Sequence, residues 1–165
     1  LVRVDGQIIT ASRQEDAEVF SNMIKQYKTD ASIWLSGLRE GKPLDLNISL
    51  TKRPPPSNEL PKLKDETFEF SLREISFADR VNARLSDNHA GIIVENVEPA
   101  GWAALSGLRQ GDFLLEIEKQ PIKSIKQYKE MIEKQITAQK EKIIFFVRRG
   151  IHTMYLEIQP DWNKN

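Results

Sequence analysis

The stretch 99-PAGWAALSGLRQGDFLLEI-117 decides the fold. A run of small residues ends at Gly107, a second turn follows at Gly111-Asp112, and an apolar strand-like run closes the stretch. Pro99 and the alanines after it predict one short turn of helix that packs close to a sheet. Gly107 suits the left-handed residue that ends such a helix, since glycine has no Cβ to clash. The stretch is therefore scaffold, and it returns the chain into a core.

Composition limits the classes of function. The 165 residues are 39% hydrophobic and 29% charged, as in an ordinary soluble globular protein. Lys and Arg total 24, and so do Asp and Glu, so no global field draws the chain to nucleic acid or to an anionic membrane. The chain has no cysteine, which excludes disulfides and thiolate metal sites. It also has no apolar run of about 18 residues, so we expect no membrane insertion.

A change in composition divides the chain. The segment 52-KRPPPSNELPKLKDE-66 holds four prolines and little that can be buried, which predicts an extended, semi-rigid linker. We therefore expect a first domain over 1–53, a linker over 54–66, a second domain over 67–160 and a tail over 161–165.

Periodicity predicts the elements of the second domain. The run 67-TFEFSLREI-75 alternates apolar and polar residues, as a half-buried strand does. A short helix over 76–85 begins at Ser76, with Asp79 placed for a capping box. A buried strand follows at 92–97, then a helix over 124–136 with an apolar face, and a strand pair over 143–158.

The first 50 residues repeat the second half of that domain. Residues 1–9 match 114–122, and each run is followed by an amphipathic helix containing Met-Ile, then by a strand pair with an Arg-x-Gly turn. The first unit has no counterpart of residues 67–113. We therefore expect one whole domain preceded by the end of another. Such a half domain exposes a face, so we expect 1–53 to be poorly stable alone and to self-associate or pack on a partner.

These motifs resemble the bacterial PDZ pattern. The resemblance rests on Gly91-Ile92-Ile93-Val94, on the small-residue run from Pro99 to Leu108, and on Gly111-Asp112. It covers 67–160 nearly end to end, whereas 1–53 resembles the second half of such a domain. It implies a mixed α/β (α+β) fold, a small, partly open β-barrel or sandwich with two helices.

Two PDZ domains joined by a Pro-rich linker resemble the C-terminal region of HtrA/Deg serine proteases, though other envelope proteins carry such domains too. The resemblance implies a non-catalytic module that recognises substrate or regulates a protease domain upstream of Leu1. It also implies a bacterial periplasm or cell envelope location, and it implies no cofactor.

In this family a peptide C-terminus adds as a strand beside the second helix, and a loop of backbone N–H groups receives its carboxylate. The partners implied are polypeptide C-termini or unfolded protein segments. The family's apolar-Gly-apolar loop falls on Phe68-Glu69-Phe70, and an apolar Ile125 favours an apolar side chain two positions before the peptide's end. The peptide-binding residues carried over by the resemblance are Phe68, Glu69, Phe70, Ser71, Leu72, Ile125, Lys129 and Ile132.

One position departs from the family pattern. Glu69 stands where the family has Gly, and Glu66 adds negative charge nearby, although Lys62 and Lys64 could compensate. The alternative is that Phe68 and its neighbours are core residues of a structural module, which mediates oligomer or scaffold contacts without a peptide ligand.

The other candidate residues give weaker evidence of function. His89 and a nearby Asp87 lack any nucleophile setting such as Gly-x-Ser-x-Gly, so we expect a surface turn and no catalytic residue. His89 and His152 lie far apart without carboxylates at ligand spacing, which predicts no metal site. The lysines over 119–142 alternate with glutamates, which indicates a solvated face. Trp102 is interpreted either as a contact surface or as packing beneath the linker.

Overall fold

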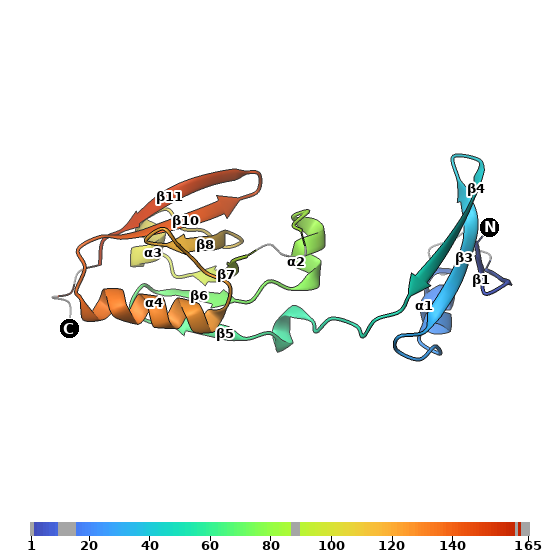
Figure 1. Cartoon of the computed structure of the whole chain (residues 1–165). Helices are drawn as coiled ribbons and strands as arrows, with labels where there is room; N and C mark the ends of the chain where they lie inside the picture. Colours follow the sequence, from blue (N-terminus) through green and yellow to red (C-terminus); the bar gives the residue numbers. More distant parts are fainter. Residues whose placement is uncertain (1, 10–15, 87–89, 161, 163–165) are drawn as a thin grey trace. The chain divides into compact units, whose positions relative to one another are not determined.

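The computed structural model describes residues 2–9, 16–86, 90–160 and 162, and the chain divides into two compact units. The first unit is Leu1–Arg53 and the second is Pro54–Asn165 (Figure 1). The segment 87–89, which includes His89, lies outside the described residues. No described helix is long and apolar enough to cross a membrane.

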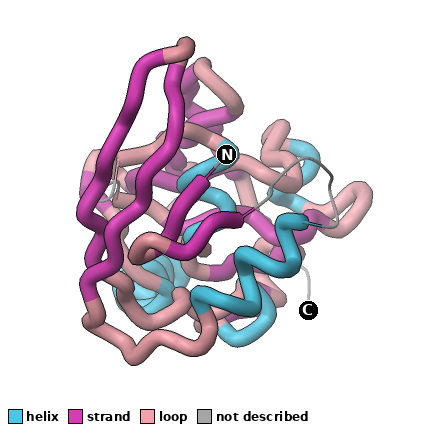
Figure 2. The backbone as a smooth tube through the Cα atoms, turned by 90° about the vertical axis from the view of Figure 1, so that its right-hand side faces the viewer, coloured by secondary structure: helices cyan, strands magenta, loops and turns pink. Residues whose placement is uncertain are grey.

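The first unit is one antiparallel sheet with a helix. Its sheet has the order β2-β1-β3-β4, and Figure 2 shows the long β3–β4 hairpin in magenta. Ile33 is buried with Val4 and Ile9, and the α1 residues Phe20 and Ile24 pack against them. The elements are β1 (Val2–Val4), β2 (Gln7–Ile9), α1 (Asp16–Ile24), β3 (Ser32–Arg39) and β4 (Lys42–Ser49).

The second unit has one sheet of the order β11-β10-β8-β7-β6-β5, with β9 paired to β8. All neighbouring strands are antiparallel. The elements are η1 (Ser57–Glu59), β5 (Lys62–Asp65), β6 (Phe70–Arg73), α2 (Phe77–Asn82), β7 (Ile92–Val97), α3 (Trp102–Leu105), β8 (Phe113–Ile117), β9 (Gln120–Pro121), α4 (Ile125–Thr137), β10 (Ile143–Arg149) and β11 (His152–Ile158).

One large hydrophobic cluster and a smaller one around Ile75, Ile93 and Phe113 hold the second unit together. The helix α4 contributes its apolar face, Ile125, Tyr128 and Ile132, to a cluster with residues of β6, β7, β8 and β10. At the start of α2, Ser76 and Asp79 form the capping box that their spacing predicts. The mixed α/β fold class expected from the sequence is confirmed.

The segment expected to be a linker contributes a strand to this sheet. Residues 62–65 form β5, which pairs with β6 from Lys62↔Arg73 to Asp65↔Phe70. Leu63 packs against the core, whereas Lys62 and Lys64 on either side of it stay exposed. Upstream, Pro54, Pro55 and other residues line a hollow of about 310 Å³ beside α2. A strand of alternating Lys and Leu fits an edge because only one of its faces is buried.

The tail also contributes to the core. Trp162, expected beyond the domain, packs edge-on against Phe68 with ring centroids 6.3 Å apart. Its indole N–H donates to the Lys140 carbonyl at 3.1 Å. Trp102 is partly buried and packs against the same core.

The stretch 99–117 differs from expectation at its start. The helix α3 begins at Trp102 with Gly101 as its N-cap, not at Pro99, and Ala100 takes a positive φ of 62°. A Cβ on Gly101 would lie 2.8 Å from Cβ of Glu69, so only glycine lets the two segments approach. Gly107 ends the helix at φ +88°, as predicted.

Asp112 in the same stretch ties the sheet to the loop before it. Its side chain is fully buried and forms a two-pronged ion pair with Arg149 of β10, at 2.7 Å for each pair of atoms. It also accepts the backbone N–H of Arg109 at 2.9 Å, and Arg149 donates to the Gly107 carbonyl at 2.8 Å. The Asp of the Gly-Asp turn is therefore a structural anchor.

The β1–β2 hairpin of the first unit and the β8–β9 hairpin of the second share a set of hydrogen bonds. In the first, the Asp5 N–H donates to the Trp34 carbonyl, and the Trp34 N–H donates to the Asp5 carboxylate, at 2.9 and 2.8 Å. In the second, Glu118 exchanges the same two bonds with Ile144, at 2.9 and 2.7 Å. Asp5 and Glu118 both have positive φ. The aligned positions of the sequence repeat thus make the same backbone contacts.

Candidate functional site

The candidate site lies where β6 and α4 meet, one strand in from the β5 edge of the second sheet, and we call it the β6–α4 site. Phe70 and Leu72 of β6 and Ile132 of α4 are buried together in the core. Ser71 is half-buried on the other face of the strand. The ring of Phe70 meets the ring of Tyr128 edge-on, with centroids 6.1 Å apart.

The edge of β6 at this site is occupied by β5. The two strands are antiparallel, and the turn between them closes with a bond from the Glu69 N–H to the Asp65 carbonyl at 2.9 Å. The Glu74 N–H extends the pairing by donating to the Pro61 carbonyl at 3.0 Å. An edge strand normally leaves its backbone groups free for another chain. Here the chain's own segment takes them.

Asp65 places a carboxylate at the centre of the site. One of its oxygens accepts the backbone N–H groups of Thr67 and Phe68, each at 3.0 Å. The other accepts the hydroxyl of Tyr128 from α4 at 2.6 Å. Asp65 is 7% exposed and Tyr128 is fully buried. The loop and the helix therefore supply three converging donors to one buried carboxylate.

Burial changes the acidities of the Asp65 carboxyl and the Tyr128 hydroxyl. Burial raises the pKa of Asp65 above its usual value, although the hydrogen bonds from Tyr128, Phe68 and Thr67 oppose the rise. Burial, together with the charge of Asp65, raises the pKa of Tyr128 well above its usual value. Tyr128 therefore acts as a hydrogen-bond donor, because its phenol stays protonated.

Glu69 takes a backbone conformation that glycine adopts more readily than other residues. Its φ is +62°, in the left-handed region. The Glu69 carboxylate accepts the N–H of Trp102 at 3.2 Å, and its carbonyl accepts the N–H of Glu98 at 2.9 Å. Both contacts hold the loop to the start of α3, as does the bond from the Ala103 N–H to the Phe68 carbonyl at 3.1 Å. Glu69 therefore holds the left-handed conformation without being glycine.

Charged side chains line the outer face of the same strands. Lys62 of β5 pairs with Glu95 of β7 at 2.5 Å, and the Arg73 Nε lies 3.8 Å from the same carboxylate. Arg73 also makes a two-pronged pair with Asp79, at 2.5 and 3.0 Å. Burial raises the pKa of Asp79, but hydrogen bonds from Arg73 and Ser76 outweigh it, so that this pKa falls to about 2.

The lowered pKa of Asp79 predicts that the protein loses stability in acid. A carboxyl whose folded pKa lies near 2, below the usual 3.8, contributes stability above 3.8 that is lost as the pH falls toward 2. The difference in unfolding free energy between the protein and its Asp79→Asn variant should therefore shrink over that window. Carboxyl NMR titration of the folded chain measures the same pKa, and a midpoint near 3.8 would contradict the prediction.

The structure brings together most of the residues expected at the site. Phe68, Phe70, Leu72, Ile125 and Ile132 are all buried in one cluster. Lys129 is not among them, because its side chain is 63% exposed and lies 3.9 Å from Glu133. Sequence reasoning missed Asp65, Leu63 and Glu95. The sequence did indicate that Tyr128 faces the core, because it follows Ile125 by three residues on the apolar face of the helix.

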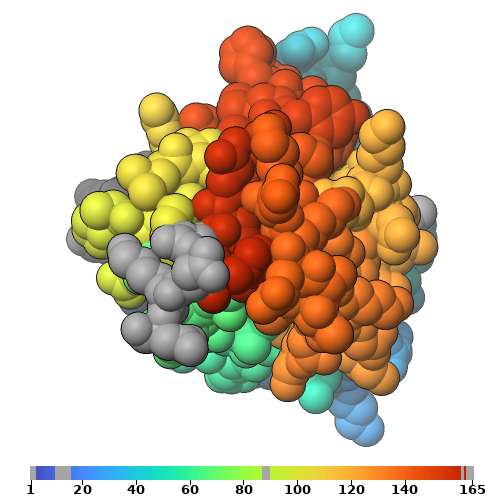
Figure 3. Space-filling view, turned by 90° about the vertical axis from the view of Figure 1, so that its left-hand side faces the viewer, coloured from blue at the N-terminus to red at the C-terminus, as the bar shows by residue number. Residues whose placement is uncertain are grey.

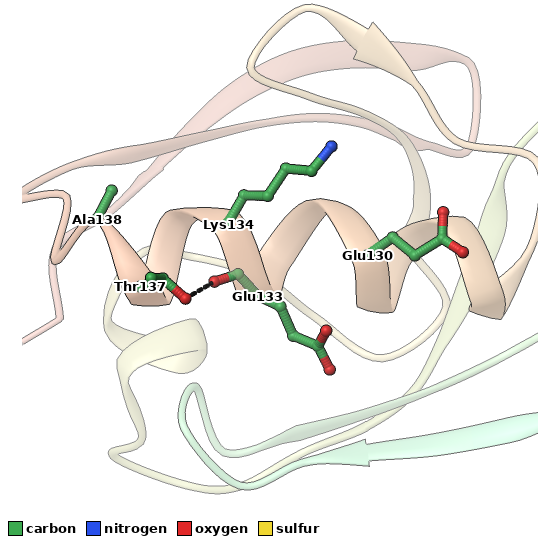
Figure 4. A pocket seen from close by; sticks show the side chains of 5 residues that line it. All are labelled: Glu130, Glu133, Lys134, Thr137 and Ala138. Carbon is green, nitrogen blue, oxygen red and sulfur yellow. Dashed lines mark hydrogen bonds between the residues drawn. The ribbon is translucent and has the colours of Figure 1, made fainter.

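The opposite side of α4 offers only a shallow surface. A hollow of about 630 Å³ is lined by Glu130, Glu133, Lys134, Thr137 and Ala138 (Figure 4). Thr137 donates to the Glu133 carbonyl of its own helix at 2.8 Å, as the dashed line shows. In the part of the chain that the structure describes, no group of three His, Cys, Asp or Glu residues could hold a metal ion.

Comparison with known proteins connects this geometry to a family. Residues 93–149 match the family model of the PDZ domain. The chain is 20% identical over 147 residues to a probable periplasmic serine endoprotease, DegP-like, of Chlamydia pneumoniae. It is 27% identical over 161 residues to a probable periplasmic serine protease, do/HhoA-like, of Haemophilus influenzae. The matches cover 89% and 93% of this chain but only 29% and 31% of those proteins.

Two solved structures also match. The HtrA3 PDZ domain bound to a phage-derived ligand has a TM-score of 0.47 and 19% identity, over 61% of this chain and 89% of that one. The HtrA-type protease AlgW with a decapeptide has a TM-score of 0.47 and 23% identity, over 59% of this chain and 30% of that one.

Proposed function

We propose that the second unit, whose residues 93–149 match the PDZ family model, binds extended polypeptide segments, C-termini included, by strand addition to β6 beside α4. One observation carries the proposal: an extended segment, β5, already pairs with β6 at this place and sends a carboxylate to the loop and to α4. Main-chain pairing gives affinity in this mode of recognition, and alternate side chains give specificity.

The relatives suggest a parent protein. Both are named as serine proteases of the periplasm, and this chain spans less than a third of their lengths. We propose that the chain recognises substrate for, or regulates, a protease domain of the same kind in the periplasm. The catalytic residues of such a domain would lie outside this chain.

The first unit fits the same scheme. Its sequence repeats the second half of the PDZ unit, and its first hairpin repeats the bonds between Glu118 and Ile144. We propose that residues 1–53 are the second half of a further PDZ domain. Trp34, Leu38 and Ile8 are more than half exposed there, which supports contact with another surface.

The competing function is a structural module without a peptide ligand. It is favoured by the same strand β5, because a filled edge has no free backbone groups to offer. In that case β5 would be a permanent part of the sheet, and the module would act through scaffold or oligomer contacts.

A titration separates the two functions. We expect C-terminal peptides, added to the 15N-labelled chain, to shift the amide signals of β6 and α4, whereas Glu130 on the outer side of α4 stays unchanged. The chain carrying Leu63→Ser, in which β5 is weakened, should respond at lower peptide concentration. A flat response from both chains, with self-association instead, would contradict peptide binding.

A further inference from the structure

We propose that β5 is an internal stand-in for the ligand, and that its side chains show which segments displace it. Such a segment has a carboxylate at the position of Asp65, an apolar side chain two residues earlier, and a cation three residues earlier. The inference rests on the proposed function, and it adds both the ligand chemistry and the competition with residues 62–65.

The backbone of β5 occupies the edge of β6 with which a bound peptide would pair. Four residue pairs join it to β6, and its end at Asp65 lies opposite Phe70, where β6 begins. The loop that follows turns its N–H groups back on this end, from Thr67 and Phe68 to the carboxylate and from Glu69 to the carbonyl. A second strand cannot pair with the same edge of β6 while β5 is there.

The inward side chains of β5 define two requirements. Asp65 is 7% exposed, and its carboxylate meets the hydroxyl of Tyr128. Leu63, two residues earlier, points to the same face and packs against the core that α4 helps to build. These positions hold one acceptor for several donors and one apolar group, so a displacing segment must supply both.

The outward side chains add a third requirement. Lys62 reaches Glu95 at 2.5 Å, and the two side chains are 41% and 33% exposed. Glu95 stays accessible to a cation on whichever strand occupies this edge. Lys64 pairs with its neighbour Glu66, and both side chains are largely exposed, so this position sets no requirement.

Residues 62–65 form a short strand at the edge of the sheet, and this position makes exchange feasible. Leu63 is the only apolar side chain in the strand, and it is only partly buried. An edge strand held by four residue pairs separates from its sheet more easily than a central strand does. Figure 3 shows the green residues of this region beside the orange surface of α4, at the outside of the unit.

A reversible cross-link tests the exchange. The chain has no cysteine, and Lys64 lies opposite Ser71 across the two strands, so Lys64→Cys with Ser71→Cys introduces one disulfide that locks β5 on β6. The probe is the hexapeptide Leu-Pro-Lys-Leu-Lys-Asp, a copy of residues 60–65 with a free carboxylate. We expect the reduced chain to bind it and the oxidised chain to bind at least about tenfold more weakly, because the binding-competent fraction falls.

Two matched peptides test the ligand chemistry. Glu in place of the first Lys should weaken binding to the reduced chain several-fold, and Ser in place of the second Leu should weaken it further. In a chain that also carries Glu95→Gln, the Lys and Glu peptides should bind alike. Equal affinity of all three peptides for the reduced chain would overturn the chemistry proposed.

The outcomes separate this inference from the proposed function. Equal binding to the oxidised and reduced chains would overturn the exchange while leaving peptide binding intact. If no peptide binds the reduced chain or the Leu63→Ser chain, peptide binding itself fails, and the inference with it. Because the same molecule is compared in two redox states, misfolding of a variant cannot imitate the expected result.

Discussion

Replacing Asp112 by alanine is expected to destabilise the second unit by about 3 kcal/mol, the lower end of the cost of breaking a buried ion pair. Asp112 is fully buried, whereas its partner Arg149 has a side chain that is 30% exposed and therefore keeps some contact with water. The substitution also removes the acceptor of the Arg109 N–H. The loop from Gly107 to Gly111 would then lose the tie that runs through Asp112, while the bond from Arg149 to the Gly107 carbonyl remains.

Hydrogen exchange of the amides of β8 and β10 measures this effect, because these strands belong to the second unit alone. The matched control is Glu157→Ala, which breaks the exposed pair with Lys142, and it should cost far less because water screens exposed ion pairs. A double substitution of Asp112 and Arg149 should cost less than the sum of the two single ones. Equal losses of stability in Asp112→Ala and Glu157→Ala would refute the role of Asp112 as a structural anchor.

Asp65→Ala is expected to cost about 2 kcal/mol, since it leaves buried donors without an acceptor. The N–H groups of Thr67 and Phe68 and the hydroxyl of Tyr128 all point to the Asp65 carboxylate, and Phe68 and Tyr128 are fully buried. The loss should be concentrated at β5, whose amides would exchange faster than those of β8. Lys64→Ala in the same strand is the control, and it should leave exchange almost unchanged.

The charge of Asp65 adds a pH dependence of known sign. Because burial raises the folded pKa of this carboxyl above 3.8, its contribution to stability is fully present below 3.8 and declines as the pH rises through the folded value. Asp65→Asn removes that titration. The stability of the protein relative to the Asn variant should therefore fall with rising pH and then level off. A difference that grows with pH would show that the pKa is lowered instead.

Local patterns predicted much of the second unit. The capping box of Ser76 and Asp79, the strand at 92–97 and the core face of α4 follow from spacing over a few residues, and each is present. Of the peptide-binding residues expected in β6, Phe70 and Leu72 also lie together with Ile125 and Ile132 of α4. The start of α3 was placed too early, because the close approach of Gly101 to Glu69 joins segments far apart in the chain.

The sequence by itself determined the elements, the mixed α/β class and the PDZ resemblance, because these depend on periodicity, turn residues and short motifs. Only the tertiary structure decided what occupies the edge of β6. Lys62 to Asp65 read as linker because their single apolar residue has no visible partner in the sequence. Asp65 meets Tyr128 63 positions away, and Asp112 meets Arg149 37 positions away. Partners at such separations are set by how the sheet folds, so local patterns do not reveal them.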